Sequence, residues 1–141
     1  MPTYSSSISI NASQESVWKV LSDVTHWHEW TPTVTKVDVL DQPELKLGSR
    51  YKVYQPKIQP AVWIVTTFVP PSSFVWEANL PGMHMVAEHM LKQVSADQTQ
   101  LTLTFTFKGW LGRIMGNLYR STVESYIAIE AQSLKKRVEV G

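Results

Sequence analysis

The chain has 141 residues, of which 43% are hydrophobic, and this length predicts one domain, residues 1–141, with a sizeable buried core. Its formal net charge of +1, with both signs interspersed, argues against nucleic acid and anionic membranes as partners. The absence of cysteine excludes disulfides, thiolate nucleophiles and cysteine-bound zinc. No apolar run approaches the roughly 20 residues of a membrane span, so we expect no membrane insertion and a cytoplasmic location.

The start of the chain predicts one strand followed by two short helices. Residues 4–10 alternate polar and apolar side chains, as a strand does. Ser13 has the side chain of a helix N-cap and is expected to begin the first short helix. A second short helix over residues 25–30 would place Trp27 and Trp30 on the same side.

The middle of the chain predicts six further strands, separated by Pro, Gly, Asp and Asn turn signals. Their short connections favour antiparallel neighbours. The last strand alternates most clearly, because Leu103 and Phe105 face one way and the threonines between them face the other. The same count turns Trp76, Met85 and His89 inward. The six strands are expected at residues 34–40, 49–55, 61–69, 72–79, 83–94 and 99–107.

The apolar period from residue 110 to about residue 138 predicts one long helix. Gly109, Gly112 and Gly116 each weaken its start, by about 1 kcal/mol relative to alanine inside a helix. We therefore expect a kinked or mobile entrance to this helix. The side expected to face the sheet carries Met115, Leu118, Tyr119, Thr122, Tyr126 and Ile129, with Val123, Ile127 and Leu134 on its flank.

Three runs of the sequence resemble a known superfamily. The superfamily's pattern of Ala-x-x-Glu-x-Val-Trp, then Asp, then Trp-x-x-Trp-x-Pro is similar to the run SINASQESVWKVLSDVTHWHEWTPTV. FVWEANLPG, and ADQTQLTLTFTF leading into a helix that ends IEAQSLKKRVE, add support. Over nearly its whole length the chain resembles the START-like (SRPBCC) superfamily of birch-pollen allergens, lipid-transfer domains and bacterial polyketide cyclases. It is most similar to the polyketide cyclase/dehydrase and lipid-transport branch.

The resemblance implies an α+β helix-grip fold. In that fold a curved seven-stranded antiparallel sheet surrounds a long C-terminal helix, with two short helices after the first strand. It also implies an elongated cavity whose mouth lies near the two short helices. It implies no universal catalytic residue, because the superfamily contains carriers as well as cyclases and hydrolases. Function must therefore be argued from the site. The sequence has no glycine-rich phosphate loop, and we expect no cofactor.

His89 and Glu130 are the candidate catalytic residues. An inward imidazole at His89 could bind or deprotonate a ligand hydroxyl, although a core hydrogen bond is the alternative. Helical spacing places Glu130 beside the sheet-facing side, where it could anchor a ligand, act as an acid or base, or form a salt bridge, for example to Arg50. His26 and Glu29 share one side of a short helix, but two ligands are too few, and we expect no metal site.

Aromatic, methionine and other side chains could line the cavity and contact a ligand. They would offer flat apolar walls with a few polar tips. The sequence cannot show whether a void exists between them. The candidate ligand-binding residues are Tyr51, Trp63, Trp76, Met85, His89, Leu103, Phe105, Met115, Tyr119, Thr122 and Tyr126.

Three functions remain open from the sequence. The first is binding of an apolar small molecule of lipid, polyketide or aromatic type, which enters between the short helices and residues 109–116. The second is a polyketide cyclase or dehydratase that uses His89 as its acid or base. A weaker alternative is a protein-interaction domain with Trp27, Trp30 and Trp110 as exposed anchors. The sequence leaves open whether the protein is an enzyme and what its oligomeric state is.

Overall fold

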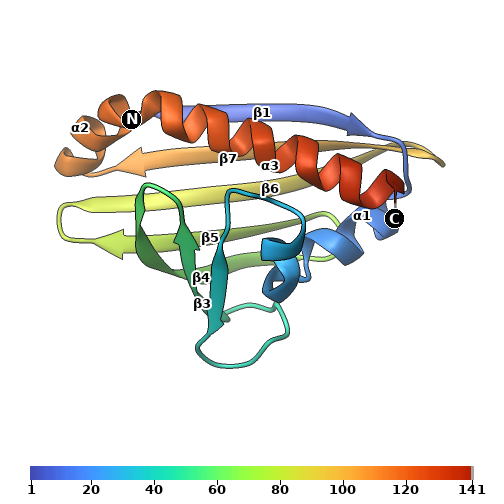
Figure 1. Ribbon diagram of the computed structural model, residues 1–141, viewed down its shortest axis with the longest axis horizontal. Helices are drawn as coiled ribbons and strands as arrows, with labels where there is room; N and C mark the ends of the chain where they lie inside the picture. Colours follow the sequence, from blue (N-terminus) through green and yellow to red (C-terminus); the bar gives the residue numbers. More distant parts are fainter. Residues whose placement is uncertain (141) are drawn as a thin grey trace.

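A seven-stranded antiparallel sheet curves around the C-terminal helix α3 (Arg120–Val140) in the computed structural model, which describes residues 1–140 (Figure 1). The predicted α+β helix-grip fold is therefore confirmed. Predicted and observed strand ends differ by three residues at most. The strands are β1 (Thr3–Ile10), β2 (Lys36–Val39), β3 (Arg50–Gln55), β4 (Ile58–Val69), β5 (Ser73–Leu80), β6 (Met83–Ser95) and β7 (Gln98–Lys108).

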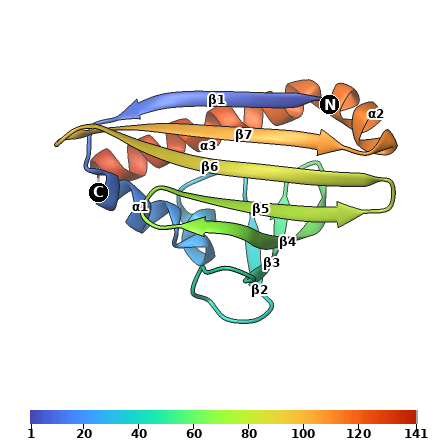
Figure 2. The same ribbon diagram turned by 180° about the vertical axis from the view of Figure 1, so that it is seen from behind.

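The order of strands across the sheet is β1-β7-β6-β5-β4-β3-β2. Neighbours are thus consecutive in the chain, except that β1 pairs with β7. Figure 2 shows this sheet from its outer side, with α3 behind it. Outward hydroxyl groups cross the β1–β7 pair, where Ser5 and Thr104 lie 2.9 Å apart and Ser7 and Thr102 lie 3.0 Å apart between their side-chain oxygens. The first and last strands are therefore fixed to each other by side chains as well as backbone.

Two short helices follow β1, namely α1 (Gln14–Leu21) and the 3-10 helix η1 (Val24–Glu29). The predicted N-cap is present, because the Ser13 side chain accepts a hydrogen bond from the Ser16 amide. Trp27 is only 2% exposed, and its indole N–H donates to the Leu21 carbonyl oxygen at 2.9 Å. Trp27 therefore cannot be a surface anchor, and of the proposed anchors only Trp110, which is 72% exposed, lies fully at the surface.

The predicted long helix is broken into α2 (Trp110–Leu118) and α3. The break lies at Tyr119, where φ is −98° and ψ is 15°. Helix α2 packs closely on the start of the chain: a Cβ atom added at Gly116 would lie 2.7 Å from the ring of Pro2. Because α2 packs on Pro2, the chain bends at Tyr119 before α3 packs against the concave side of the sheet.

The predicted sheet-facing side of the long helix is wrong in part. Leu118 is 68% exposed, and neither Leu118 nor Thr122 lines the space between the helix and the sheet. The bend at Tyr119 changes the phase of the helix, so the side that was expected on the flank of α3 enters the core. The buried residues of α3 are Val123, Ile127, Ala131 and Leu134.

The far end of α3 is tied to the end of β1. The Lys135 ammonium donates to the Ser9 carbonyl oxygen at 2.8 Å, and the Asn11 amide donates to the Glu139 carboxylate at 2.7 Å. The helix is thereby held at both ends, since α2 packs on Pro2 at the other. The space between its middle and the sheet is bounded by fixed walls.

Candidate functional site

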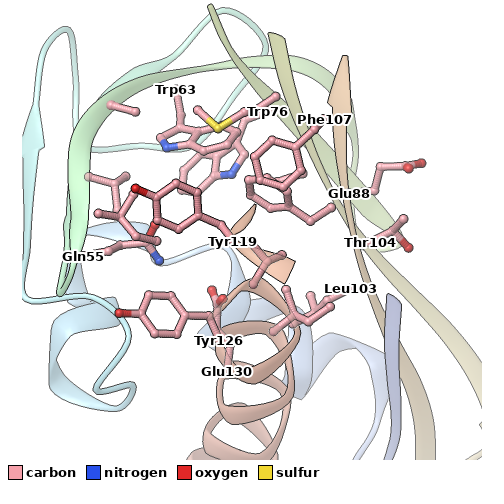
Figure 3. A pocket seen from close by; sticks show the side chains of 18 of the residues that line it. Gln55, Trp63, Trp76, Glu88, Leu103, Thr104, Phe107, Tyr119, Tyr126 and Glu130 are labelled. Carbon is pink, nitrogen blue, oxygen red and sulfur yellow. The ribbon is translucent and has the colours of Figure 1, made fainter. Parts of the chain in front are cut away.

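The concave side of the sheet and helices α2 and α3 enclose a cavity of about 330 Å³ (Figure 3). This volume falls within the range of about 300–1,000 Å³ that is typical of small-molecule sites. Strands β3 to β7 contribute alternate, inward-pointing residues, and the two helices close the open side. The void that sequence alone could not establish is therefore present.

Aromatic rings form one wall of the cavity. The ring centroids of Trp63 and Trp76 lie 5.8 Å apart, and those of Trp63 and Phe105 also lie 5.8 Å apart. Phe107 continues the wall, with its ring 5.0 Å from that of Phe105. Trp63, whose strand has apolar residues on both faces, points inward and is 5% exposed. The wall is large, flat and apolar, as a polycyclic or aromatic ligand requires.

The mouth of the cavity lies at the bend between α2 and α3. Gln59 on β4, Leu80 on β5 and Tyr119 at the bend are exposed to solvent while lining the cavity. Beside them the Tyr126 hydroxyl donates to the Pro56 carbonyl oxygen and joins α3 to the β3–β4 hairpin. The expected mouth near the two short helices is therefore wrong, because the η1 residue that lines the cavity, Trp27, is buried.

His89 lines the cavity but is held as a core residue. Its ring stacks on Phe74 at 4.0 Å between centroids, and Trp76 meets it edge-on at 5.6 Å. Its Nδ1 atom lies 3.2 Å from the Phe74 carbonyl oxygen, the one hydrogen bond that the His89 side chain makes within residues 1–140. Burial lowers the pKa of His89 to about 4, so the imidazole is neutral at pH 7 and a weak base.

Glu130 directs its carboxylate from α3 into the cavity (Figure 3). Burial raises the pKa of Glu130 to about 7, since no nearby charge compensates the carboxylate. Within the part of the chain that the structure describes, the Glu130 carboxylate makes no hydrogen bond or ion pair. The expected bridge to Arg50 is wrong, because that guanidinium binds Asp41 at 2.9 Å on the outside of the molecule.

Charge in the cavity lining is confined to one sign. No lysine or arginine of residues 1–140 lines the cavity. Glu88 and Thr104 border it through their strands, but Figure 3 shows both side chains on the other side of the sheet, pointing away. Glu130 is therefore the acidic side chain that faces the interior.

Most of the predicted lining residues border the cavity, and two do not. Tyr51 is fully buried behind the wall, 6.1 Å from Trp76 between ring centroids, and its hydroxyl donates to the Pro43 carbonyl oxygen. Thr122 lies one position before the inward Val123 on α3 and is not part of the lining. The predicted residues that line the cavity are Trp63, Trp76, Met85, His89, Leu103, Phe105, Met115, Tyr119 and Tyr126.

Several lining residues at the mouth were not predicted. Gln55 and Ile58 come from the turn between β3 and β4, whose approach to α3 depends on how far the sheet curls. Leu111 is different, because it precedes Met115 and Tyr119 at helical spacing. That spacing of four residues was the available signal for Leu111.

Two further features bear on the class of site. No three histidine or acidic side chains among residues 1–140 are grouped so that they could hold a metal ion. None of the helices in this range is long and apolar enough to cross a membrane.

The curved sheet, the gripped helix and the cavity between them define a START-like domain. Residues 1–139 match the family described as polyketide cyclase/dehydrase and lipid transport, and the chain belongs to that family. Comparison with curated proteins finds no match at the sequence level.

Solved structures share the fold at low sequence identity. The Zhui aromatase/cyclase from Streptomyces sp. R1128 is 18% identical with a TM-score of 0.79, over 97% of this chain and 93% of that chain. A hypothetical protein of Helicobacter pylori is 12% identical with a TM-score of 0.83, over 96% and 87% of the two chains. A START superfamily protein of Mycobacterium smegmatis is 18% identical with a TM-score of 0.72, over 98% and 97%. These similarities establish the fold alone.

Proposed function

We propose that the protein binds an apolar small molecule of lipid, polyketide or aromatic type in this cavity. The observation that carries the proposal is the void itself, about 330 Å³ lined by aromatic and aliphatic side chains. Natural cores contain few voids larger than a water molecule, because each one sacrifices packing. A ligand would recover those contacts and gain the transfer free energy of its apolar surface.

A polyketide cyclase or dehydratase is the second candidate. It is supported by His89 and Glu130, two groups capable of moving protons, on the lining of one cavity. It is the weaker candidate because burial holds the pKa of His89 near 4, and Phe74 and Trp76 pack around the ring. A base with so low a pKa accepts protons poorly at neutral pH, so binding without turnover is the better supported function.

Native mass spectrometry of the freshly purified protein tests whether the cavity is occupied. We expect a species heavier than the chain, which releases an apolar compound on denaturation. The chemical class of that compound would identify the natural ligand. Only the bare chain mass, recovered also after incubation with lipid and polyketide extracts, would contradict the proposal.

A cavity-filling variant tests where a ligand binds. Ala87 lies on the cavity lining, so the side chain of Ala87→Phe would occupy the void. We expect this variant to bind the neutral dye N-phenyl-1-naphthylamine at least about tenfold more weakly than the wild type, as measured by fluorescence titration.

Val86→Phe is the matched control, because Val86 is the preceding residue of β6 and points to the outer face opposite Thr106. It should bind the dye as the wild type does, and circular dichroism should show both variants folded. Equal dye binding by the two variants would mean that the dye does not enter the cavity.

A further inference from the structure

Glu130 has a position that indicates what kind of ligand the cavity takes. Val123, Ile127 and Glu130 are spaced three or four residues apart on α3 and all line the cavity. The carboxylate thus continues an apolar stripe and points toward the space below Trp63 and Trp76, as Figure 3 shows. A charged group at such a position is costly unless it has a partner.

Among residues 1–140, no side chain or backbone group forms a hydrogen bond or ion pair with the Glu130 carboxylate. The Tyr126 hydroxyl, one helical turn away, already donates to the Pro56 carbonyl oxygen. The His89 Nδ1 atom is used by the Phe74 carbonyl oxygen. The first basic residue on each side of Glu130 along the helix is engaged outside the cavity: Arg120 binds Glu124 at 2.7 Å, and Lys135 binds the Ser9 carbonyl oxygen.

The surroundings of the carboxylate favour a positive charge. The rings of Trp63, Trp76 and Tyr119 line the same space, and the faces of aromatic rings attract cations. An anionic ligand would meet an unpaired carboxylate, with no lysine or arginine of the described chain to balance it. A neutral hydrocarbon would leave the carboxylate without a hydrogen-bond donor.

We propose that the cavity selects a hydrophobic amine, whose protonated nitrogen binds the Glu130 carboxylate while its ring system packs against Trp63 and Trp76. This inference rests on the proposed function, since it names the ligand class of the same cavity. The ammonium supplies a positive charge that no lining residue of the described chain provides, and charge-assisted hydrogen bonds are stronger than neutral ones.

Three naphthalene compounds of nearly equal size test the inference, namely 1-naphthylmethylamine, 1-naphthalenemethanol and 1-naphthoic acid. Calorimetric titrations near pH 8 keep Glu130 ionised, because burial raises its pKa only to about 7. We expect the amine to bind at least about tenfold more tightly than the alcohol, and the acid to bind most weakly.

Glu130→Gln keeps the size of the side chain and removes its charge. It should weaken amine binding at least about tenfold and change alcohol binding by less than about threefold, so that the two compounds bind alike. Glu124→Gln is the matched control: this residue lies on the same helix, is exposed, and pairs with Arg120 outside the cavity. It should retain the wild-type preference for the amine.

The outcomes separate the inference from the proposed function. Binding of amine and alcohol with equal affinity to the wild type would overturn the amine inference and leave apolar binding intact. Tighter binding of the acid, or a preference for the amine that survives Glu130→Gln, would overturn it as well. Failure of all three compounds to bind would contradict both.

Discussion

Glu130 and His89 respond to the same apolar surroundings in opposite directions. Burial disfavours the charged form of each group, so it raises the pKa of Glu130 from 4.5 to about 7 and lowers the pKa of His89 from 6.5 to about 4. The other titratable side chains that face the cavity are Tyr119 and Tyr126, since Glu88 points outward. The two shifts make opposing contributions to stability over one range of pH.

The signs follow from which state binds more protons. Between about pH 4.5 and 6.5 the folded protein keeps Glu130 protonated while the unfolded chain loses that proton, so the contribution of Glu130 to stability falls as pH rises. Over the same range the unfolded chain protonates His89 and the folded protein does not, so its contribution rises with pH. In the wild type the two contributions largely cancel.

Single variants should expose the two slopes. In Glu130→Gln the free energy of unfolding should rise relative to wild type from pH 4.5 to 7, and in His89→Phe it should fall from pH 4 to 6.5, each by on the order of 2–3 kcal/mol. Urea denaturation across this range measures both. The other carboxylates contribute equally to all three proteins, so parallel pH profiles would show that neither pKa is shifted.

The sequence predicted the position of His89 well, but it predicted the surroundings of Glu130 only in part. Strand alternation placed His89 on the inward face of β6, as the structure has it. Helical spacing placed Glu130 beside the core but could not reveal its missing partner. That depends on where the fold brings each cation, and Arg50 lies against Asp41 instead.

At the scale of elements, helix α2 is shaped by its contact with the start of the chain. A Cβ atom at Gly116 would lie 2.7 Å from Pro2 and 3.0 Å from the Phe107 ring, whereas one at Gly112 would have its nearest neighbours at 3.3 to 3.6 Å. Both glycines lie inside the helix, where alanine is intrinsically better by about 1 kcal/mol. Alanine substitutions at these two positions therefore distinguish the effect of helix propensity on stability from the effect of packing against Pro2 and Phe107.

Gly116→Ala should destabilise the protein by about 1–3 kcal/mol, because overpacking against Pro2 and Phe107 outweighs the gain in helix propensity. Gly112→Ala should change stability by less than about 1 kcal/mol, since its neighbours need to move only slightly. Urea unfolding midpoints of the two variants give the comparison. Equal effects would mean that the close approach of α2 to Pro2 does not set its packing.

The helix break shows why the site was only partly predictable. The apolar period correctly indicated a helical segment from residue 110 onward, and the glycines indicated weakness near its start. The bend at Tyr119 comes three residues after Gly116, which packs closely on Pro2, a residue far from it in the sequence. A local sequence pattern carries no information about such a contact. The prediction of which side of α3 faces the sheet was therefore partly wrong, and so was the prediction that Thr122 lines the cavity.

For the whole molecule, pattern and family resemblance were sufficient to predict the fold. Alternation and turn signals gave the strands and their antiparallel neighbours, and the resemblance gave the curved seven-stranded sheet around the final helix; the pairing of β1 with β7 was not predicted. The cavity could not be predicted from the sequence, because its volume is a small difference between the space that the backbone encloses and the volume that the side chains fill. Tyr51 illustrates the limit: it points inward, as expected, yet its ring is behind Trp76 and not in the cavity.

The pairing of β1 with β7 has a consequence for how the chain folds. β1 is synthesised before the other strands of this sheet, and both of its partners, β7 and α3, come after β2 to β6 in the chain. Contacts so distant in sequence favour slow folding, on a scale of about milliseconds to seconds for small β-rich domains. Until β7 emerges, β1, which carries Ile8 and Ile10 on its apolar side, has no strand to pair with. During synthesis β1 therefore stays unpaired while β2 to β6 emerge, and the sheet can close around α3 only after β7 and α3 have both been made.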